Sequence, residues 1–225
     1  EQDDIALLQY TGGTTGKSKA AVLTHKNLLS NVQQVSNWIE PHIKSGKEII
    51  ITALPLFHIF SFTVNCLTFL KIGAENVLIA NPRDLKSFLK VLEKKKFTVM
   101  TAVNTLFNLL LTSKKFKELD FSEFKFSVGG GMAVMSETAK NWKKVTGTNI
   151  TQGYGLTETS PVVSINKIDN PFNGSIGLPV QSTNIKIIDE SGKNVDDEQP
   201  GELCVKGPQV MSGYWKYKED HENPF

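Results

Sequence analysis

Two hydrophobic patterns alternate along most of this chain. Short, uninterrupted apolar runs are typical of buried strands, and segments whose apolar residues recur at helical spacing are typical of amphipathic helices. Strands are expected at residues 5–8, 20–23, 49–51, 77–79, 97–102, 126–128 and 149–152, and helices at 24–39, 60–71, 85–92, 105–111 and 136–145. Because such alternation buries each strand between helices, it predicts an α/β fold, with helices packed on a largely parallel sheet.

Polar and small residues mark the ends of several of these helices. Thr24 and Ser136 are N-cap candidates, and residues 81–84 (Asn-Pro-Arg-Asp) cap the helix that begins after them. Gly147 is expected to end the helix that Ser136 begins, because glycine tolerates the left-handed conformation found at helix C-termini.

The pattern changes near residue 183. Residues 185–189 and 202–206 are typical of short antiparallel strands, and a turn is expected at residues 190–192 (Glu-Ser-Gly). We therefore expect an α/β unit over residues 1–182 and the start of a small, β-rich, barrel-like subdomain over residues 183–225. Both ends of the chain look cut, so we expect a fragment of a larger domain.

Composition narrows the class of protein. The chain has 225 residues, of which 40% are hydrophobic, enough for a substantial core. Its 25 basic and 23 acidic residues give a net charge of +2, so nucleic acid is not an expected partner. No signal peptide is visible, and no apolar run approaches the roughly 20 residues of a transmembrane helix.

Two cysteines and two lysine clusters give information on the cellular compartment of the protein. Cys66 and Cys204 are flanked by apolar residues, which favours reduced core thiols over a disulfide or a metal pair. The lysines of residues 94–96 and 114–117 favour solvated helix ends, with contact to an anionic membrane surface as the alternative. We expect a soluble, cytoplasmic protein, with peripheral contact to the inner face of the membrane as that alternative.

The most distinctive polar segment is residues 10–20, Tyr-Thr-Gly-Gly-Thr-Thr-Gly-Lys-Ser-Lys-Ala. Glycine amides, threonine hydroxyls and lysine charge together suit a polyphosphate, and a polar surface hairpin is the alternative. A Walker loop is rejected, because Thr11 stands where its first glycine belongs. In addition, residues 20–23 are typical of a strand, where that motif needs a helix.

This segment resembles the phosphate loop of adenylate-forming enzymes, Tyr-Thr-Ser-Gly-Thr-Thr-Gly-x-Pro-Lys-Gly. It departs from that pattern at Gly12, Ser18 and Ala20, and the first of these departures is similar to bacterial long-chain fatty-acid–CoA ligases. The resemblance implies that the segment binds the phosphates of ATP. The residues so assigned are Thr11, Gly12, Gly13, Thr14, Thr15, Gly16 and Lys19.

A glycine run at residues 129–131 follows the strand expected at 126–128. Ligands of parallel sheets gather at the carboxyl ends of the strands, and a simple strand-to-helix connection is the alternative. In adenylate-forming enzymes the matching segment forms a wall of the adenine pocket and borders the acyl site. The resemblance therefore places Gly130 and Gly131 at the nucleotide, and the acyl chain between residues 102–106 and 129–132.

Residues 152–159, Gln-Gly-Tyr-Gly-Leu-Thr-Glu-Thr, follow another expected strand. Their tyrosine can stack on a purine and their glutamate can bind magnesium. The segment matches the Gly-Tyr-Gly-x-Thr-Glu motif of adenylate-forming enzymes without departure, which implies that its first threonine approaches the α-phosphate. The residues so assigned are Gln152, Gly153, Tyr154 and Thr157 at the nucleotide, and Glu158 with Thr11 at Mg²⁺.

His58 lies in the apolar segment 55–60 (Pro-Leu-Phe-His-Ile-Phe), which follows a strand. From the residues alone, a core histidine with satisfied ring nitrogens is the alternative to a site residue. The resemblance places this histidine at the substrate carboxylate, near the α-phosphate. Amino-acid-activating relatives typically carry an aspartate close by, and here Ile59 and Phe60 stand instead, which favours an uncharged substrate tail.

The closing signature of the family's β subdomain matches residues 200–203 and 207–215. Its role in the family is mainly structural, so we assign it no chemistry. Residues 81–84, 103–107 and 174–179 also look like bacterial long-chain fatty-acid–CoA ligases, so the resemblance covers essentially the whole chain.

The resemblance implies a two-step ligase reaction, in which a fatty acid and ATP give acyl-AMP and coenzyme A then displaces AMP. The expected catalytic residues are Lys19, His58, Thr157 and Glu158, with ATP, Mg²⁺ and coenzyme A as cofactors and co-substrates. One alternative is a relative that activates another acyl or aryl acid or passes it to a carrier protein. The other is a non-catalytic nucleotide-binding module. The chain alone is expected to be inactive, because the family's ribose-binding aspartate and C-terminal lysine lie outside it.

Overall fold

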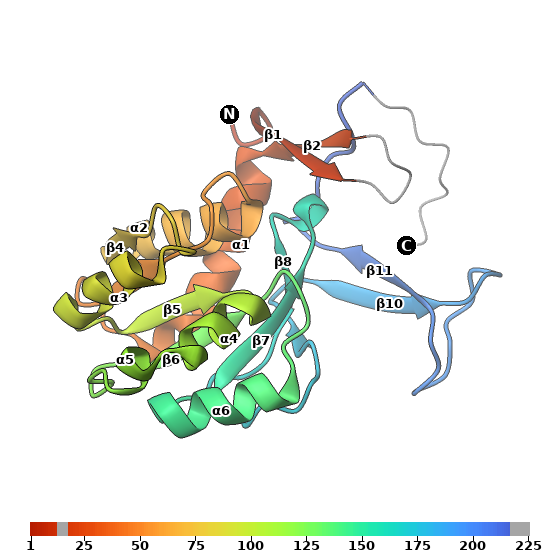
Figure 1. Cartoon of the computed structure of the whole chain (residues 1–225). Helices are drawn as coiled ribbons and strands as arrows, with labels where there is room; N and C mark the ends of the chain where they lie inside the picture. Colours follow the sequence, from red (N-terminus) through yellow and green to blue (C-terminus); the bar gives the residue numbers. More distant parts are fainter. Residues whose placement is uncertain (13–17, 217–225) are drawn as a thin grey trace.

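The computed structural model describes residues 1–12 and 18–216. Its main sheet has seven strands in the order β4-β3-β5-β6-β7-β8-β9 (Figure 1). The parallel strands are β4 (Glu75–Leu78), β3 (Ile49–Thr52), β5 (Val99–Ala102), β6 (Phe126–Gly129) and β7 (Ile150–Gly155). Two antiparallel strands, β8 (Val162–Ile165) and β9 (Leu178–Pro179), extend the sheet beyond β7. The predicted α/β fold with a largely parallel sheet is confirmed.

Helices cover both faces of this sheet. One face packs against α1 (His25–Ile39), the π-helix η2 (Ser61–Thr68) and α2 (Phe69–Lys71). The other packs against α3 (Leu85–Lys94), α4 (Asn104–Thr112), α5 (Lys114–Lys117) and α6 (Ser136–Thr146). Successive strand residues point to opposite faces. Ile50 and Val99 therefore pack with α1 and η2, while Ile51 and Met100 pack with the second group.

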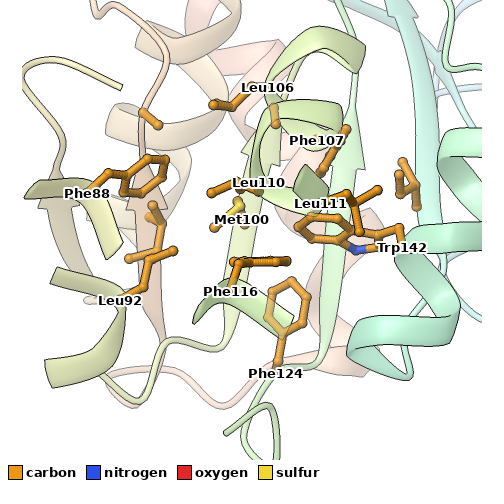
Figure 2. Close-up of a cluster of buried hydrophobic side chains, with 14 of the residues drawn as sticks. Phe88, Leu92, Met100, Leu106, Phe107, Leu110, Leu111, Phe116, Phe124 and Trp142 are labelled. Atoms are coloured by element: carbon orange, nitrogen blue, oxygen red, sulfur yellow. The ribbon is translucent and has the colours of Figure 1, made fainter. Parts of the chain in front are cut away.

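The core under α3–α6 is rich in aromatic rings (Figure 2). The Trp142 ring lies 4.6 Å from Phe107 and 5.3 Å from Phe116, measured between centroids, and Phe124 packs at its edge. Edge-to-face and tilted contacts of this kind add to the stabilisation from burial alone. This core supports the sheet from one side and leaves the α1 and η2 side to form the cavity described below.

Three predicted helix ends are confirmed. The Thr24 hydroxyl accepts a hydrogen bond from the Asn27 N–H (3.2 Å), as an N-cap of α1 should. Asp84 does the same for the Ser87 N–H (3.2 Å) at the start of α3. Gly147 ends α6 in the left-handed region, at φ 78°.

The predicted N-cap of α6 is wrong by one residue. Ser136 is the first residue of the helix, and Met135 precedes it in extended conformation. The Met135 N–H donates to Asn104 Oδ1 (3.0 Å) on α4, and no side chain caps the first turn of α6.

The helix predicted over residues 60–71 is wound as a π-helix over most of its length. The Thr68 hydroxyl donates to the Thr63 carbonyl five residues earlier (2.9 Å), a spacing that suits the wider π turn. Asn65 is fully buried and bridges Thr101 on β5 (2.9 Å) and Thr52 on β3 (3.1 Å). Buried polar contacts therefore fix this helix to the sheet.

Strand β8 was not predicted, and it is anchored by α1. The Asn31 side chain donates to the Val162 carbonyl (2.9 Å) and accepts from the Val162 N–H (3.0 Å). This amide thus makes the pair of hydrogen bonds that a neighbouring strand would make. The rest of this short run pairs with β7 on one side and with β9 on the other.

A separate antiparallel hairpin, β1 (Ile5–Gly12) and β2 (Ser18–Thr24), carries the phosphate-loop segment. A strand follows the loop, so the rejection of a Walker loop is confirmed. The predicted phosphate-binding residues Gly13, Thr14, Thr15 and Gly16 lie outside the described residues.

The predicted antiparallel strands near the C-terminal end are confirmed as β10 (Asn184–Ile188) and β11 (Glu202–Lys206), which project away from the main sheet (Figure 1). After β11 the chain returns to β2, where Ser212 donates to the Val22 carbonyl (3.1 Å) and Val22 donates to the Gly213 carbonyl (2.9 Å). The division at residue 183 stays a prediction.

The first lysine cluster lies at the end of α3, whereas residues 114–117 are the short helix α5, which was not predicted. Lys95 pairs with Glu75, and Lys114 lies 3.7 Å from Glu118. Both cysteines are free thiols, with Cys204 buried. Within residues 1–12 and 18–216, every helix is too short or too polar to cross a membrane.

Candidate active site

A cavity of about 240 Å³ opens where the parallel strands end. Its rim is mostly polar or glycine-rich and comes from Thr11, His58, residues 129–131 and residues 153–158. Its interior is almost wholly apolar. The interior residues include Val35, Ile39, Phe60, Val64, Phe69, Val99, Phe126, Val128, Val162 and Ile165. Such a cavity suits a ligand with a polar head and an apolar tail.

Four segments that are far apart in the sequence meet at this rim. They are the end of β1, the loop after β3, the loop after β6, and the end of β7 with the short helix η3 (Thr157–Thr159). Carboxyl ends of parallel strands are the usual ligand-binding edge of such sheets. The predicted site residues on the cavity are Thr11, His58, Gly130, Gly131, Gly153, Tyr154, Thr157 and Glu158.

The end of β7 is shaped by an irregularity in its pairing with β8. The register shifts between Tyr154 and Gly155, and a shift of this kind changes the direction of nearby side chains. A Cβ at Gly155 would lie 2.2 Å from the Pro161 carbonyl oxygen, so only glycine fits here. Gly155 is therefore required by the packing of β7 against the turn that leads into β8.

The glycines after β6 let the backbone lie close to the side chains that line the cavity. A Cβ at Gly130 would lie 3.2 Å from the Phe60 ring, which lines the cavity. Gly131 has φ +76°, which side chains rarely adopt. Both residues line the cavity, and their predicted contact with the nucleotide stays a prediction.

His58 is exposed, so the alternative of a buried core histidine is wrong. The Phe60 N–H donates to His58 Nδ1 (3.2 Å), which leaves the neutral ring with its proton on Nε2. His58 also lines the cavity, and its predicted contact with the substrate carboxylate stays a prediction.

Gln152 is buried and belongs to the scaffold behind the rim. Its Oε1 accepts the Val134 N–H (2.7 Å), and its Nε2 donates to the carbonyls of Gly174 (3.1 Å) and Ser175 (2.9 Å). Its side chain therefore joins β7 to the loop after β6 and to a second loop. Among the residues described, it is not part of the cavity lining, so its predicted nucleotide contact stays a prediction.

Replacing Gln152 with leucine should lower the free energy of unfolding by about 1–3 kcal/mol, because the buried Val134 N–H loses its acceptor. Thermal or chemical denaturation of the complete protein measures the change. The matched control is Gln33→Leu, since the Gln33 amide is exposed and its bond to Asn37 (2.6 Å) is on the surface. That control should stay within about 0.5 kcal/mol of the unchanged protein. Equal losses in both variants would contradict the scaffold role.

Lys19 and Glu158 both contact the side chain of Tyr214. Lys19 pairs in register with Thr11 across the β1–β2 hairpin, which puts the two side chains on the same face. Its Nζ lies 4.9 Å from the centroid of the Tyr214 ring. The Tyr214 hydroxyl donates to Glu158 Oε1 (2.8 Å). The segment that contains Tyr214 was assigned no chemistry from the sequence, since nothing local shows this contact.

The oxygens on this rim fit a magnesium ion that also binds phosphates. Mg²⁺ prefers hard oxygen ligands and usually keeps waters and substrate phosphates, with only one or two carboxylates from the protein. The rim offers the Glu158 carboxylate together with the hydroxyls of Thr11 and Thr157. In the described part of the chain no group of three or more acidic, histidine or cysteine side chains gathers to hold a metal alone.

Comparisons with known proteins fit this geometry. The sequence model of a family described as AMP-binding enzyme matches residues 1–215. The chain belongs to that family.

Two kinds of AMP-binding relatives are informative. A long-chain-fatty-acid–CoA ligase of Escherichia coli O6:H1 is 54% identical over 215 residues, which is 95% of this chain and 38% of the relative's length. The crystal structure of ATP-bound MatB from Rhodopseudomonas palustris superposes with a TM-score of 0.83 at 28% identity, covering 96% of this chain and 42% of MatB. An anthranilate CoA ligase, AuaEII, in complex with anthranoyl-AMP gives a TM-score of 0.87 at 25% identity, with coverage of 96% and 42%. This chain thus spans less than half the length of each.

Proposed function

We propose that the protein carrying this AMP-binding chain activates a fatty acid with ATP and transfers the acyl group to coenzyme A. The observation that carries the proposal is the cavity, which joins a deep apolar interior to a rim of glycines, hydroxyls and one carboxylate. The 54% identity to a long-chain-fatty-acid–CoA ligase supports the same substrate class.

In the first step a carboxylate oxygen attacks the α-phosphorus of ATP, and the bond to pyrophosphate breaks. The product is acyl-AMP. In the second step the thiol of coenzyme A attacks the acyl carbon, a thioester forms, and AMP leaves with the electrons of the broken bond. Both reactants of the first step are anionic, so positioning and charge neutralisation are the main tasks of the protein.

The rim residues divide these tasks by their chemistry. His58 Nε2 donates to the substrate carboxylate and orients it. Tyr154 stacks on the adenine against the glycine run, and the Thr157 hydroxyl contacts the α-phosphate. Lys19 and the phosphate loop hold the β- and γ-phosphates. Mg²⁺, held by Glu158 and Thr11, supplies charge neutralisation at the phosphates when bound.

The interior of the cavity favours an uncharged tail. Among its described lining residues, Glu158 at the rim is the sole carboxylate, and no lysine or arginine is present. Ile59 and Phe60, where amino-acid-activating relatives typically carry an aspartate, are both buried. An ammonium group placed inside would lose its hydration without gaining a partner, which is costly.

Exchange of pyrophosphate into ATP by the complete protein tests the proposal. The acids to compare are fatty acids of increasing length, an aryl acid such as anthranilate, and phenylalanine. Fatty acids should support exchange best, and added coenzyme A should convert the bound adenylate to thioester. A preference for the aryl or amino acid contradicts the substrate class, and exchange with none of the acids contradicts adenylation.

A further inference from the structure

Tyr214 contacts both charged residues on which the proposed nucleotide site depends. Its hydroxyl donates to Glu158 Oε1 (2.8 Å), and Lys19 Nζ lies over its ring, 4.9 Å from the centroid. One side chain therefore connects the carboxylate on η3 with the ammonium on β2.

The backbone around Tyr214 holds it in this place from two sides. The Met211 N–H donates to the carbonyl of Glu158 itself (2.8 Å). The Trp215 N–H donates to the Ala20 carbonyl on β2 (2.8 Å), and Tyr214 forms a bridge with Ala21. Residues 211–215 are thus a clamp that joins β2 to η3.

The Tyr214 ring is also fixed by packing. It lies against the small apolar cluster formed by Ala21, Leu23, Leu28 and Ile59, all of which are buried. Because the ring is anchored in this cluster, the hydroxyl and the ring face have defined directions.

We propose that Tyr214 is a positioning residue for the nucleotide site, an inference that rests on the proposed function. Its hydroxyl orients the Glu158 carboxylate by binding Oε1, which leaves Oε2 available to a metal ion. A charge-assisted hydrogen bond of this kind is both strong and directional. The electron-rich face of its ring holds the Lys19 ammonium on the same side of the hairpin as Thr11.

Two substitutions separate the hydroxyl from the ring. In the complete protein, Tyr214→Phe keeps the ring and removes the hydroxyl, whereas Tyr214→Leu removes both. Isothermal titration calorimetry measures the affinity for ATP with Mg²⁺ and, separately, for ATP in EDTA, with no turnover required. Tyr214→Phe should weaken binding of the ATP–Mg²⁺ complex on the order of 10-fold, because the Glu158 carboxylate loses the hydrogen bond that orients it. Binding of metal-free ATP should stay unchanged.

Tyr214→Leu should show the same loss and should also weaken binding of metal-free ATP by about twofold to fivefold, because Lys19 loses its aromatic contact. Trp215→Phe is the matched control, because that side chain is exposed and has Lys216 over its ring, and only its backbone N–H takes part in the clamp. It should change neither affinity. Melting temperatures of all variants show whether the fold is kept.

A parallel measurement on Glu158→Gln separates this inference from the proposed function. If Glu158→Gln weakens binding of the magnesium complex and Tyr214→Phe does not, the positioning role is wrong and the proposed function stands. Equal weakening with and without Mg²⁺ in Tyr214→Phe also overturns the positioning role. If neither variant affects binding of the magnesium complex, the metal role of Glu158 and the positioning role of Tyr214 are both wrong.

Discussion

Replacing Lys19 with alanine, or Glu158 with glutamine, should lower the rate of acyl-AMP formation by about 100-fold or more. The first substitution removes the ammonium that offsets the charge of the phosphates. The second removes the carboxylate charge from the rim and keeps the size of the side chain and its acceptor for the Tyr214 hydroxyl. Pyrophosphate exchange with palmitate, in the complete protein, measures both effects.

Charge-matched controls keep this result specific. Lys26→Ala on α1 and Glu137→Gln on α6 remove the same charges from exposed helix positions away from the cavity. Both should keep exchange rates close to those of the unchanged protein. If exchange survives in Lys19→Ala and in Glu158→Gln alike, the catalytic roles proposed for Lys19 and Glu158 are wrong.

The main elements of the fold could be predicted because their signals are local. The helical spacing of Leu28, Val32, Val35 and Ile39 describes the buried face of α1, and Thr24 supplies its cap. The apolar run of β3 fills both cores, since neighbouring residues point to opposite faces. In each case the apolar residues that form the sequence pattern are the residues that are buried in the core.

The exceptions depend on partners that are distant in the sequence. Asn65 and Thr68 look like polar interruptions of an apolar helix, yet they fix η2 through contacts with the sheet and with the helix backbone. Strand β8 is similar, since it pairs with β7 and β9 and its first residue bonds to Asn31 on α1. Periodicity carries no information about such contacts.

The same distinction applies to the candidate site. Residues within contiguous motifs, such as Gly130, Tyr154 and Glu158, could be assigned by resemblance, and they do share one cavity. Gln152 belongs to the same motif, but its amide is used for scaffold hydrogen bonds. Tyr214 lies in a segment with no chemical pattern, and its contact with Glu158 spans 56 residues. Only the folded arrangement shows which of these residues line the cavity.

The course of the acyl chain stays a prediction, and the cavity favours a different one. The sequence places it between residues 102–106 and 129–132. The cavity includes Gly129, Gly130 and Gly131 but then runs along the α1 and η2 face of the sheet. Ala102 and Leu106 are buried in the aromatic core on the opposite face. The cavity therefore favours Val64 and Val128 as neighbours of the acyl chain.

Filling this cavity should shorten the preferred acyl chain. Val64→Phe adds a ring to its apolar interior, so kcat/KM for palmitate should fall about 10-fold or more relative to octanoate. The melting temperature should stay close to that of the unchanged protein, because a ring in an apolar void gains dispersion contacts. The measurement is the ratio of kcat/KM for the two acids in the complete protein.

Leu106→Phe is the matched control, because it adds a ring to the core on the other face of the sheet. It should cost about 1–3 kcal/mol of stability through overpacking and leave the ratio of the two acids unchanged. The opposite result, with the ratio shifted by Leu106→Phe and not by Val64→Phe, would place the acyl chain beside α4. The two variants thus show on which face of the sheet the acyl chain lies. If the acyl chain occupies the cavity, the ratio of kcat/KM for the two acids must change when a side chain that lines the cavity is enlarged.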